Sequence, residues 1–392
     1  MFSVGLSFFS VAPIMPLILE EYSINRGTGS LLTSLVILVQ AMFSLLGGLL
    51  AGLLRPRKVI LIGCILISAP AITFALGNFW LLLLSRVLMG LGFGILGPAT
   101  IPVLMQYFRS KELPLVNSLI MSISVLGITI SSLSVAKISD SIGWEQALSV
   151  FGGAALLSTV LWLCFGHVKD IKNTDIATNE RIRQAINVIR KKETVILSSA
   201  DGGAFGQYVA LVAWLPTFYF EFHGLSLIRS GVLVSLLPLV GCLSGFMAGI
   251  LSMKYRVRKP FLIASGIMVS LGGLGSFLTA GTPLVYPSLL ILGAGSWLYV
   301  PFLLTIPMEL PGNDPAQAAM MTGVIFAVGG LVGFATPLIV GTVADVTGTY
   351  LPGFVTCSVL SLGLFLGGLL ISEPSKLSQN RHFNMSDHKQ YS

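Results

Sequence analysis

The sequence GLLAGLLRPRK at residues 48–58 returns as GILSMKYRVRK at residues 249–259. Each copy ends a long apolar run with a short basic turn, and its glycine, its arginines and its final lysine match in register. Internal repeats of apolar segments are typical of membrane transporters built from two related halves. The repeat therefore predicts two halves of similar construction, each made of membrane spans, before any substrate is considered.

The composition excludes a soluble protein. The chain has 392 residues, of which 54% are hydrophobic and 10% are charged, and its mean hydropathy is +0.89. A soluble domain carries about 25% charged residues. The net charge of +7 is not a nucleic-acid signal in such a chain, because Lys and Arg gather on the cytoplasmic side of membrane spans. We expect the lipid bilayer and a small-molecule substrate as partners, and no nucleic acid.

Twelve apolar runs are long enough to cross a bilayer as helices, which takes about 20 residues. They lack the period-2 alternation of barrel strands, so we expect an all-α membrane protein. The predicted spans are 1–20, 28–54, 57–77, 80–107, 114–138, 145–167, 197–220, 228–252, 259–280, 284–308, 316–341 and 350–371. We therefore predict two pseudo-symmetric six-helix bundles at 1–167 and 194–371, a cytoplasmic linker at 168–193 and a cytoplasmic tail at 372–392.

Further matches support the two halves. The matching pairs are 139–143 with 344–348, Gly90 with Gly293, and Pro13 with Pro216. Fewer residues precede Pro13 than precede Pro216 within its span, so we expect the first span to be shorter at its start than its repeat. The first run also lacks the basic region and cleavage site of a signal peptide.

Positive charge is distributed unevenly between the two ends of the spans. With a cytoplasmic N-terminus, the inner segments hold 19 of the 23 Lys and Arg residues. The outer loops hold Arg26, Lys137 and Arg229, and Arg86 lies within a span. This asymmetry predicts a multi-pass protein of the cell membrane with both termini in the cytoplasm. The charged stretch 180–192 is expected to be a solvated linker, with an amphipathic surface helix as the alternative.

The basic turns, the twelve spans, the repeat and the mid-chain linker together resemble the major facilitator superfamily. Its loop motif is Gly-x-x-x-Asp-Arg-x-Gly-Arg-Arg/Lys with small variations, which Gly48, Arg57 and Lys58 fit when one extra residue is allowed before the basic pair, whereas Gly52 and Leu53 stand at the Asp and Arg positions. Met253 stands at the Asp position in the second copy. In the family this Asp pairs with charges near helix ends and helps to lock the outward-facing form, so the missing Asp in both copies implies that this lock differs here.

Three shorter sequences resemble one branch of this superfamily. The span-four motif Arg-x-x-x-Gly fits residues 86–90, and AWLPT at 213–217 and LLTSL at 31–35 are similar to the cyanate-permease-like branch. Members of that branch move small anions or nitroimidazoles. The branch usually carries an Arg about eight residues before the proline of the first span, where this chain has Gly5.

The resemblance implies a secondary transporter that works by alternating access, with a small organic or inorganic anion as the expected substrate and proton coupling open. One alternative is proton-coupled drug efflux, although residues 125–129 lack the Gly-Pro pair of that branch. Another is a non-transporting sensor or scaffold, for which the predicted tail is short. No Walker A loop, Ser/His/Asp set, zinc spacing or dinucleotide loop stands out. We predict no enzyme activity, cofactor or metal, and a monomer.

Arg86 is the strongest single candidate for the transport site. An Arg at the bilayer centre costs about 2.5–3.5 kcal/mol on insertion scales, so its side chain should face a polar cavity or a partner. The family motif implies a role in contact with the substrate anion or in proton coupling. The alternatives are a structural ion pair and snorkelling to the outer interface.

Asp201 is the acidic residue expected near the inner start of the seventh span. A carboxylate inside the membrane is a candidate for proton coupling. Ser198 and Ser199 precede it, and the segment also reads as an ordinary helix start with Asp201 at the N-cap, which we take as the simpler interpretation.

Several polar and aromatic residues are expected along the substrate pathway. Besides Arg86 they are Gln40, Asn117, Gln207, Tyr208, Trp297 and Tyr299. Each alone is more often a packing residue or a helix–helix hydrogen bond. We expect kinks in the pathway-lining spans at Pro13, Pro16, Pro98, Pro216 and Pro301, because proline frees a carbonyl and bends a helix. We expect gate or anchor contacts from Gly48, Arg57, Lys58, Gly249, Arg258 and Lys259.

Overall fold

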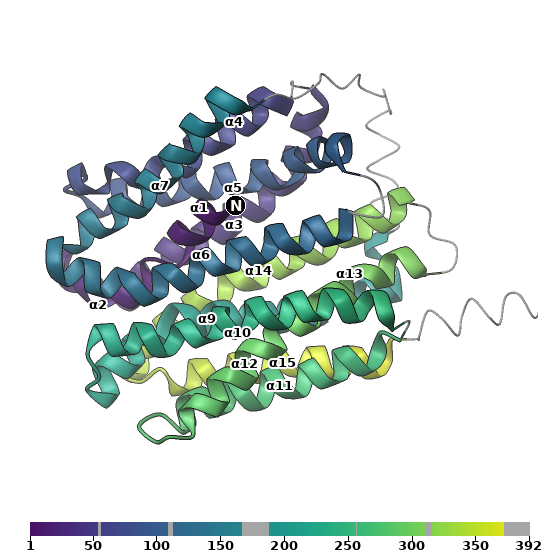
Figure 1. Cartoon of the computed structure of the whole chain (residues 1–392). Helices are drawn as coiled ribbons and strands as arrows, with labels where there is room; N and C mark the ends of the chain where they lie inside the picture. The colour runs from purple at the N-terminus through teal and green to yellow at the C-terminus, as the bar shows by residue number, and fades with distance from the viewer. Residues whose placement is uncertain (54–55, 109–112, 167–187, 256, 311–314, 372–392) are drawn as a thin grey trace, which may run out of the picture.

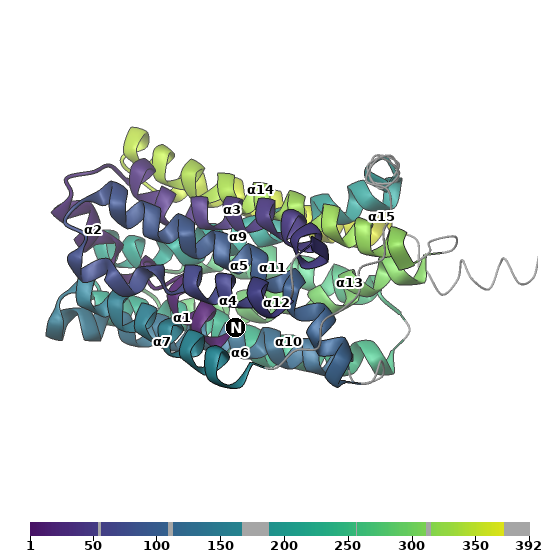
Figure 2. The same cartoon turned by 90° about the horizontal axis from the view of Figure 1, so that it is seen from above.

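The computed structural model describes residues 1–392 except 54–55, 109–112, 167–187, 256, 311–314 and 372–392 (Figure 1). Every regular element in the described part is helical. Twelve helical stretches are long and apolar enough to span a membrane. They run along one long axis of the molecule (Figures 1 and 2). The prediction of an all-α protein with twelve spans is confirmed.

The helices before residue 167 form the first six spans. They are α1 (Phe2–Phe8), η1 (Ala12–Ile14), α2 (Met15–Glu21), α3 (Arg26–Leu53), α4 (Pro56–Ile67), η2 (Ala69–Ala75), α5 (Phe79–Tyr107), α6 (Leu113–Ile142) and α7 (Trp144–Phe165). We call this set the N half; it is drawn purple to blue in the upper part of Figure 1. The charged stretch 180–192, which was expected to be a solvated linker, falls mostly outside the described residues.

The remaining helices form the other six spans. They are α9 (Lys192–His223), α10 (Leu227–Lys254), α11 (Lys259–Leu278), α12 (Val285–Leu298), α13 (Val300–Glu309), α14 (Pro315–Thr347) and α15 (Leu351–Leu370). We call this set the C half; it is drawn green to yellow in the lower part of Figure 1.

Local sequence sets the helix boundaries at the end of the molecule that holds the α3 N-terminus. The Asn78 side chain caps α5 by accepting a hydrogen bond from the Trp80 backbone N–H. The Ser226 side chain likewise caps α10 by accepting one from the Arg229 backbone N–H. Gly224 ends α9 in the left-handed conformation, which glycine adopts without steric cost. These signals keep the connections short, so consecutive spans run antiparallel.

Three of the described spans are interrupted, and prolines lie at each interruption; the third span divides into α4 and η2, with Pro70 in the first turn of η2. The first span divides into α1, η1 and α2, with Pro13 and Pro16 at the starts of the second and third pieces. The tenth span divides at Tyr299, with Pro301 in the first turn of α13. Proline lacks the N–H that would continue the helical hydrogen bonds. Pro216 and Pro98, by contrast, lie within the uninterrupted helices α9 and α5.

The internal repeat is visible in the packing of the helices. Gly90 of α5 is so close to α3 that an added Cβ would lie 2.7 Å from the Val36 carbonyl oxygen. Gly293 of α12 approaches α10 equally closely, with the corresponding distance to the Leu237 oxygen at 2.5 Å. Small residues allow helix backbones to approach in membranes. The matched glycines therefore make the same contact in both halves.

Gly5 also has a packing role. A Cβ at this position would clash with the Ser124 backbone carbonyl of α6, and Gly127 of α6 is equally close to the Phe2 carbonyl of α1. An arginine at position 5, as the resembling branch usually has, would have no room between these two helices. The departure from the branch pattern therefore comes with a direct α1–α6 contact.

The two halves meet mainly through two helix pairs, α3 with α14 and α6 with α10. In the first pair, Ser30 donates a hydrogen bond to the Pro337 carbonyl at 3.0 Å, and Gly330 packs on Ala41. In the second pair, the Cys242 thiol lies 3.4 Å from the Ser122 carbonyl oxygen. These two pairs therefore make most of the contact between the halves.

Candidate transport site

Arg86 lies about two turns into α5 and is buried in the N half, with 1% of the residue exposed. Its side chain reaches the interruption of the first span. Nη1 donates to the Ser7 carbonyl and Nη2 to the Phe8 carbonyl, each at 2.5 Å, and Nε donates to the Leu32 carbonyl at 3.3 Å. The break in the first span thus supplies carbonyl oxygens that a continuous helix would use internally.

The guanidinium of Arg86 has no acidic partner among the described residues. Its contacts are neutral carbonyl oxygens and the Met89 sulfur at 3.7 Å. The two structural alternatives therefore fail within the described chain: there is no ion pair, and the burial of the side chain rules out snorkelling. The result is a net positive charge held inside the N half.

An aromatic contact joins this region to the C half. Phe9, directly after the Arg86-bound carbonyls, packs edge-on against Tyr208 of α9 with ring centroids 6.4 Å apart. Tyr208 in turn packs edge-on against Trp297 of α12 at 5.9 Å. The predicted pathway residues Tyr208 and Trp297 therefore lie next to each other, and Tyr208 reaches the N half.

Two polar groups of this aromatic contact lack complete hydrogen bonding. The Trp297 indole N–H lies beside the Tyr208 hydroxyl, yet neither completes a hydrogen bond of ordinary geometry with a described group. The Ser7 hydroxyl is also buried and makes no hydrogen bond with a described group. Buried polar groups are normally satisfied, and the indole N–H can only donate. These groups are therefore suited to a ligand with acceptor atoms.

Asp201 lies well inside α9, which begins at Lys192, so the N-cap interpretation is wrong. The helix starts earlier than the apolar run because the polar residues before it also continue the helix. The carboxylate is buried and accepts a hydrogen bond of 2.9 Å from the Tyr299 hydroxyl. Gly329 of α14 leaves room for it, since an added Cβ there would lie 2.5 Å from Oδ2. Tyr299 sits where the tenth span divides.

The other predicted pathway residues are more dispersed. Gln207 donates to the Ser358 hydroxyl at 2.9 Å and lies against Gly273, which places it among helices of the C half. Gln40 is half-buried on α3, and its carbonyl faces Gly94 of α5. Asn117 belongs to α6, but its side chain is outside the described set.

The first basic turn is exposed where the structure describes it. Arg57 and Lys58 begin α4 with exposed side chains, and the Arg57 carbonyl accepts a hydrogen bond of 3.3 Å from the Trp162 indole of α7. Gly48 lies within α3, in a stretch whose side chains are not described. The described contact joins helices within the N half.

The second basic turn is more firmly bound. Arg258 pairs with Glu309 at 2.7 Å and donates to the Ser252 and Tyr255 carbonyls, each at 2.8 Å. Lys259 donates to the Leu369 carbonyl at 2.6 Å. Gly249 is half-buried on α10. The contacts of Arg258 and Lys259 join the ends of α10, α13 and α15, all in the C half. They fit an anchor that holds helix ends together.

The carbonyls of Ser7 and Phe8 and the ring of Phe9 were not predicted from the sequence as parts of the site. The closely spaced Pro13 and Pro16 were the available signal, because they predict an interrupted span next to whatever the freed carbonyls bind. Among the described residues, no cluster of His, Cys, Asp or Glu has the composition of a metal site.

The chain is similar in sequence to several transport proteins. The chain is similar over most of its length to the cyanate transport protein CynX of Escherichia coli, with 26% identity covering 91% of both chains. It is 23% identical to the nitrite extrusion protein of Bacillus subtilis, covering 91% of this chain and 88% of that protein. It is also 23% identical to the probable sulfoacetate transporter SauU of Cupriavidus necator, covering 95% and 93%.

Structural comparison gives the same fold. A bacterial homologue of the human lysosomal transporter Spinster superposes with a TM-score of 0.72 at 16% identity, covering 94% of each chain. The family model of the Major Facilitator Superfamily matches residues 1–323. With its twelve spans and repeated halves, the chain belongs to the Major Facilitator Superfamily and is a secondary transporter of the membrane.

Proposed function

We propose that the protein moves a small organic or inorganic anion across the membrane by alternating access, and that Arg86 is the cation that binds it. The observation that carries this proposal is a buried guanidinium with neutral oxygens as its contacts. A buried charge is costly unless it is paired. An anion entering between the halves would supply the missing opposite charge.

The neighbouring groups fit the same substrate class. The Tyr208 hydroxyl and the Trp297 N–H are donors near the aromatic contact between the halves, and donors suit the oxygen or nitrogen atoms of a small anion. A guanidinium has five N–H groups, so carbonyl bonds from three nitrogen atoms leave donor capacity for a ligand. Relatives named for cyanate, nitrite and sulfoacetate point to the same class.

Uptake into proteoliposomes tests the proposal. Purified protein is reconstituted and offered cyanate, nitrite, nitrate and sulfoacetate in turn, with ethidium as a cationic drug probe. Saturable uptake of at least one anion, lost in Arg86→Gln and kept in the exposed Arg229→Gln control, is the expected result. Ethidium movement without anion movement would favour drug efflux, and movement of no probe would favour a sensor or scaffold.

We further propose that Asp201 and Tyr299 form a proton-binding site of the C half. A tyrosine hydroxyl can donate to an ionised carboxylate or accept from a protonated one, so the pair can satisfy both states. Gly329, which packs against the carboxylate, brings no charge. A proton taken up here would change the charge of a buried group in the half opposite to Arg86.

A pH gradient distinguishes this proposal from simple exchange. With substrate inside and outside, an inward proton gradient should drive accumulation in the parent protein and not in Asp201→Asn. Equal accumulation by both proteins would remove Asp201 from coupling while leaving the anion site unaffected.

We also propose that both termini face the cytoplasm of a cell membrane, that the basic turns anchor helix ends on that face, and that the protein works as a monomer. The excess of Lys and Arg at that end supports the orientation. Cysteine labelling of Lys58→Cys from one side of the membrane tests the orientation, and mass measurement of the purified protein in detergent tests the monomer.

A further inference from the structure

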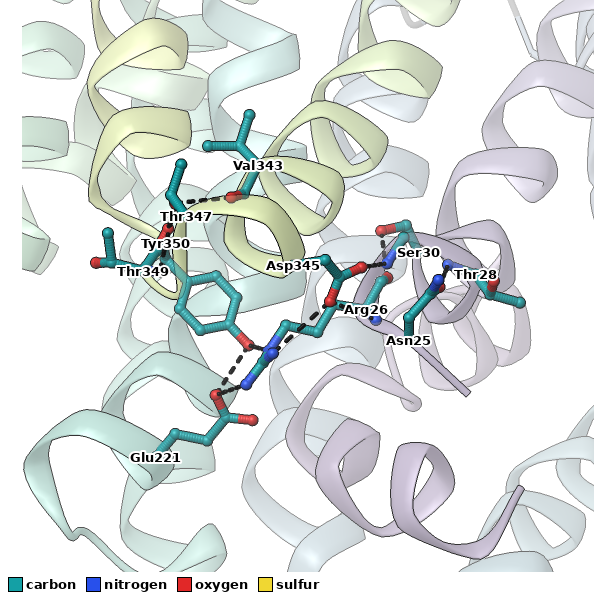
Figure 3. Close-up of polar contacts among 11 residues, drawn as sticks. Asn25, Arg26, Thr28, Ser30, Glu221, Val343, Asp345, Thr347, Thr349 and Tyr350 are labelled. Atoms are coloured by element: carbon teal, nitrogen blue, oxygen red, sulfur yellow. Dashed lines mark hydrogen bonds and ion pairs between the residues drawn. The ribbon is translucent and has the colours of Figure 1, made fainter. Parts of the chain in front are cut away.

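The opposite end of the molecule, where α3 begins, carries a cluster of charged contacts between the halves (Figure 3). Arg26 of α3 reaches across to three helices of the C half. Its Nη2 pairs with Glu221 of α9 at 2.8 Å, its Nη1 lies 3.7 Å from Asp345 of α14, and its Nε donates to the Tyr350 hydroxyl at 2.7 Å. One side chain of the N half thus contacts α9, α14 and the start of α15.

The backbone of α3 takes part as well. Asp345 accepts hydrogen bonds from the Arg26 backbone N–H at 3.1 Å and from the Gly27 N–H at 2.8 Å. A carboxylate is favourable at a helix N-terminus, because the first N–H groups there have no partner within the helix. An acidic residue of the C half therefore caps a helix of the N half.

The acidic partners need this contact for an electrostatic reason. Glu221 and Asp345 lie in the last turns of α9 and α14, where the helix dipole disfavours negative charge. Arg26 and the α3 N-terminus supply the compensating positive charge. The Tyr350 hydroxyl also donates a hydrogen bond to Glu221 at 3.1 Å. Burial is the main cause that raises the pKa of Tyr350, and the nearby Glu221 carboxylate adds to it, so this donor stays neutral.

The corresponding corner of the repeat lacks the cluster. There α10 replaces α3 and carries Arg229 in its first turn, and α6 replaces α14 and ends near Asp140. Both side chains are exposed, and no ion pair joins either of them to another described residue. The repeat alone therefore does not account for the Arg26 cluster.

We infer that Arg26, Glu221, Asp345 and Tyr350 form a latch that holds the halves together at this end and must separate for the end to open. The partners lie on both sides of the boundary along which the halves move in alternating access. The latch side chains of Arg26, Glu221 and Asp345 are 32%, 23% and 22% exposed, so water can replace their contacts when the halves part. This inference rests on alternating access and is independent of the substrate.

Distance measurements between the halves test the latch without any substrate. Spin labels are placed by Trp80→Cys on α5 and Tyr286→Cys on α12, which are exposed positions at the same end in opposite halves. The native cysteines are first replaced by serine: Cys64, Cys164, Cys242 and Cys357. Pulsed electron resonance then gives the distance distribution for the parent, Arg26→Gln and the matched control Arg229→Gln, all in lipid nanodiscs.

Arg26→Gln should add or enlarge a population at longer distance, while Arg229→Gln should match the parent. Glu221→Gln, which keeps the side-chain shape, should shift the distance distribution in the same direction. It replaces Arg26→Gln as the test if that variant does not fold. Distributions that are unchanged in both latch variants, or equally changed in Arg229→Gln, would overturn the latch. A failure to transport anions would leave this measurement unaffected.

Discussion

Among the described residues, the N half and the C half each hold one buried charged side chain that has no ion-pair partner and lies beside an interrupted span, but the two charges are opposite. In the N half, Arg86 of the fourth span binds carbonyls at the break of the first span. In the C half, Asp201 of the seventh span binds Tyr299 at the break of the tenth. The interrupted spans supply a polar partner in both cases, and neither partner neutralises the charge.

The repeat explains the shared scaffold and not the charges. Leu289, buried in α12, occupies the place in the C half that Arg86 occupies in the N half. The matched glycines Gly90 and Gly293 keep the same close helix contact in both halves. Duplication thus supplies two similar bundles, and single residues give one bundle a cation and the other a carboxylate. This division suits a cargo anion on one side and a proton on the other.

The largest expected effect comes from removing the N-half charge. Arg86→Gln should lower the rate of anion uptake at low substrate concentration by about 10- to 100-fold, since hydrogen bonds to charged groups are worth about 1.5–3 kcal/mol and 1.4 kcal/mol is tenfold. Initial rates of labelled-anion uptake give the number, with Arg229→Gln as the control. Uptake at the parent rate would place the anion elsewhere.

Removing the C-half charge should give a different defect. Asp201→Asn should abolish accumulation driven by a pH gradient while anion exchange between equal concentrations continues, because the amide takes up no proton and Arg86 is unchanged. Counterflow and gradient-driven uptake, measured on the same vesicles, separate the two activities. If exchange is lost together with accumulation, the two halves do not divide the roles as described.

Tyr299→Phe should have a smaller effect, on stability. It removes the hydroxyl that Asp201 accepts from and leaves a buried carboxylate short of one hydrogen bond, which costs about 1–3 kcal/mol. Thermal unfolding in detergent should show a lower Tm than for the parent, and the loss should largely disappear in the Asp201→Ala background, which has no side-chain acceptor to leave unpaired. An additive loss in the double variant would mean that the two side chains do not depend on each other.

The smallest difference between the N half and the C half is expected in the stability losses caused by substituting the matched glycines. Gly90→Ala and Gly293→Ala each place a Cβ against a neighbouring backbone carbonyl, so each should destabilise the protein by about 1–3 kcal/mol. The two Tm losses should be similar, because the contacts are similar. A loss confined to one glycine would show that the packing of the halves is less symmetric than these distances indicate.

Particular residues show what the sequence can and cannot predict here. A continuous apolar run of membrane length can satisfy its backbone hydrogen bonds inside a bilayer by forming a helix. This is why all twelve spans were predictable. Arg86 was predictable because a charge inside such a run needs a partner. Its actual partners, the Ser7 and Phe8 carbonyls, belong to the backbone, and their availability depends on where the first span breaks.

Asp201 and Arg26 show the opposite situation. The polar residues before Asp201 resemble a helix start, yet the helix continues through them, because packing against α14 and α15 outweighs local capping preference. Arg26 was expected in an outer loop, and its role depends on Glu221, Asp345 and Tyr350, which are about 200 or more residues away in the chain. Contacts between the halves are set by tertiary structure, which a single sequence does not reveal.

Equilibrium binding to purified protein shows whether Arg86 binds the anion, and it requires neither reconstitution nor a gradient. Calorimetric titration with the anion that the proteoliposome panel identifies, or with each of cyanate, nitrite, nitrate and sulfoacetate in turn, gives the affinity for the parent, Arg86→Gln and Arg229→Gln. We expect binding by the parent and by Arg229→Gln, and an affinity lower by about 10- to 100-fold in Arg86→Gln. Equal affinity in all three proteins would contradict this expectation.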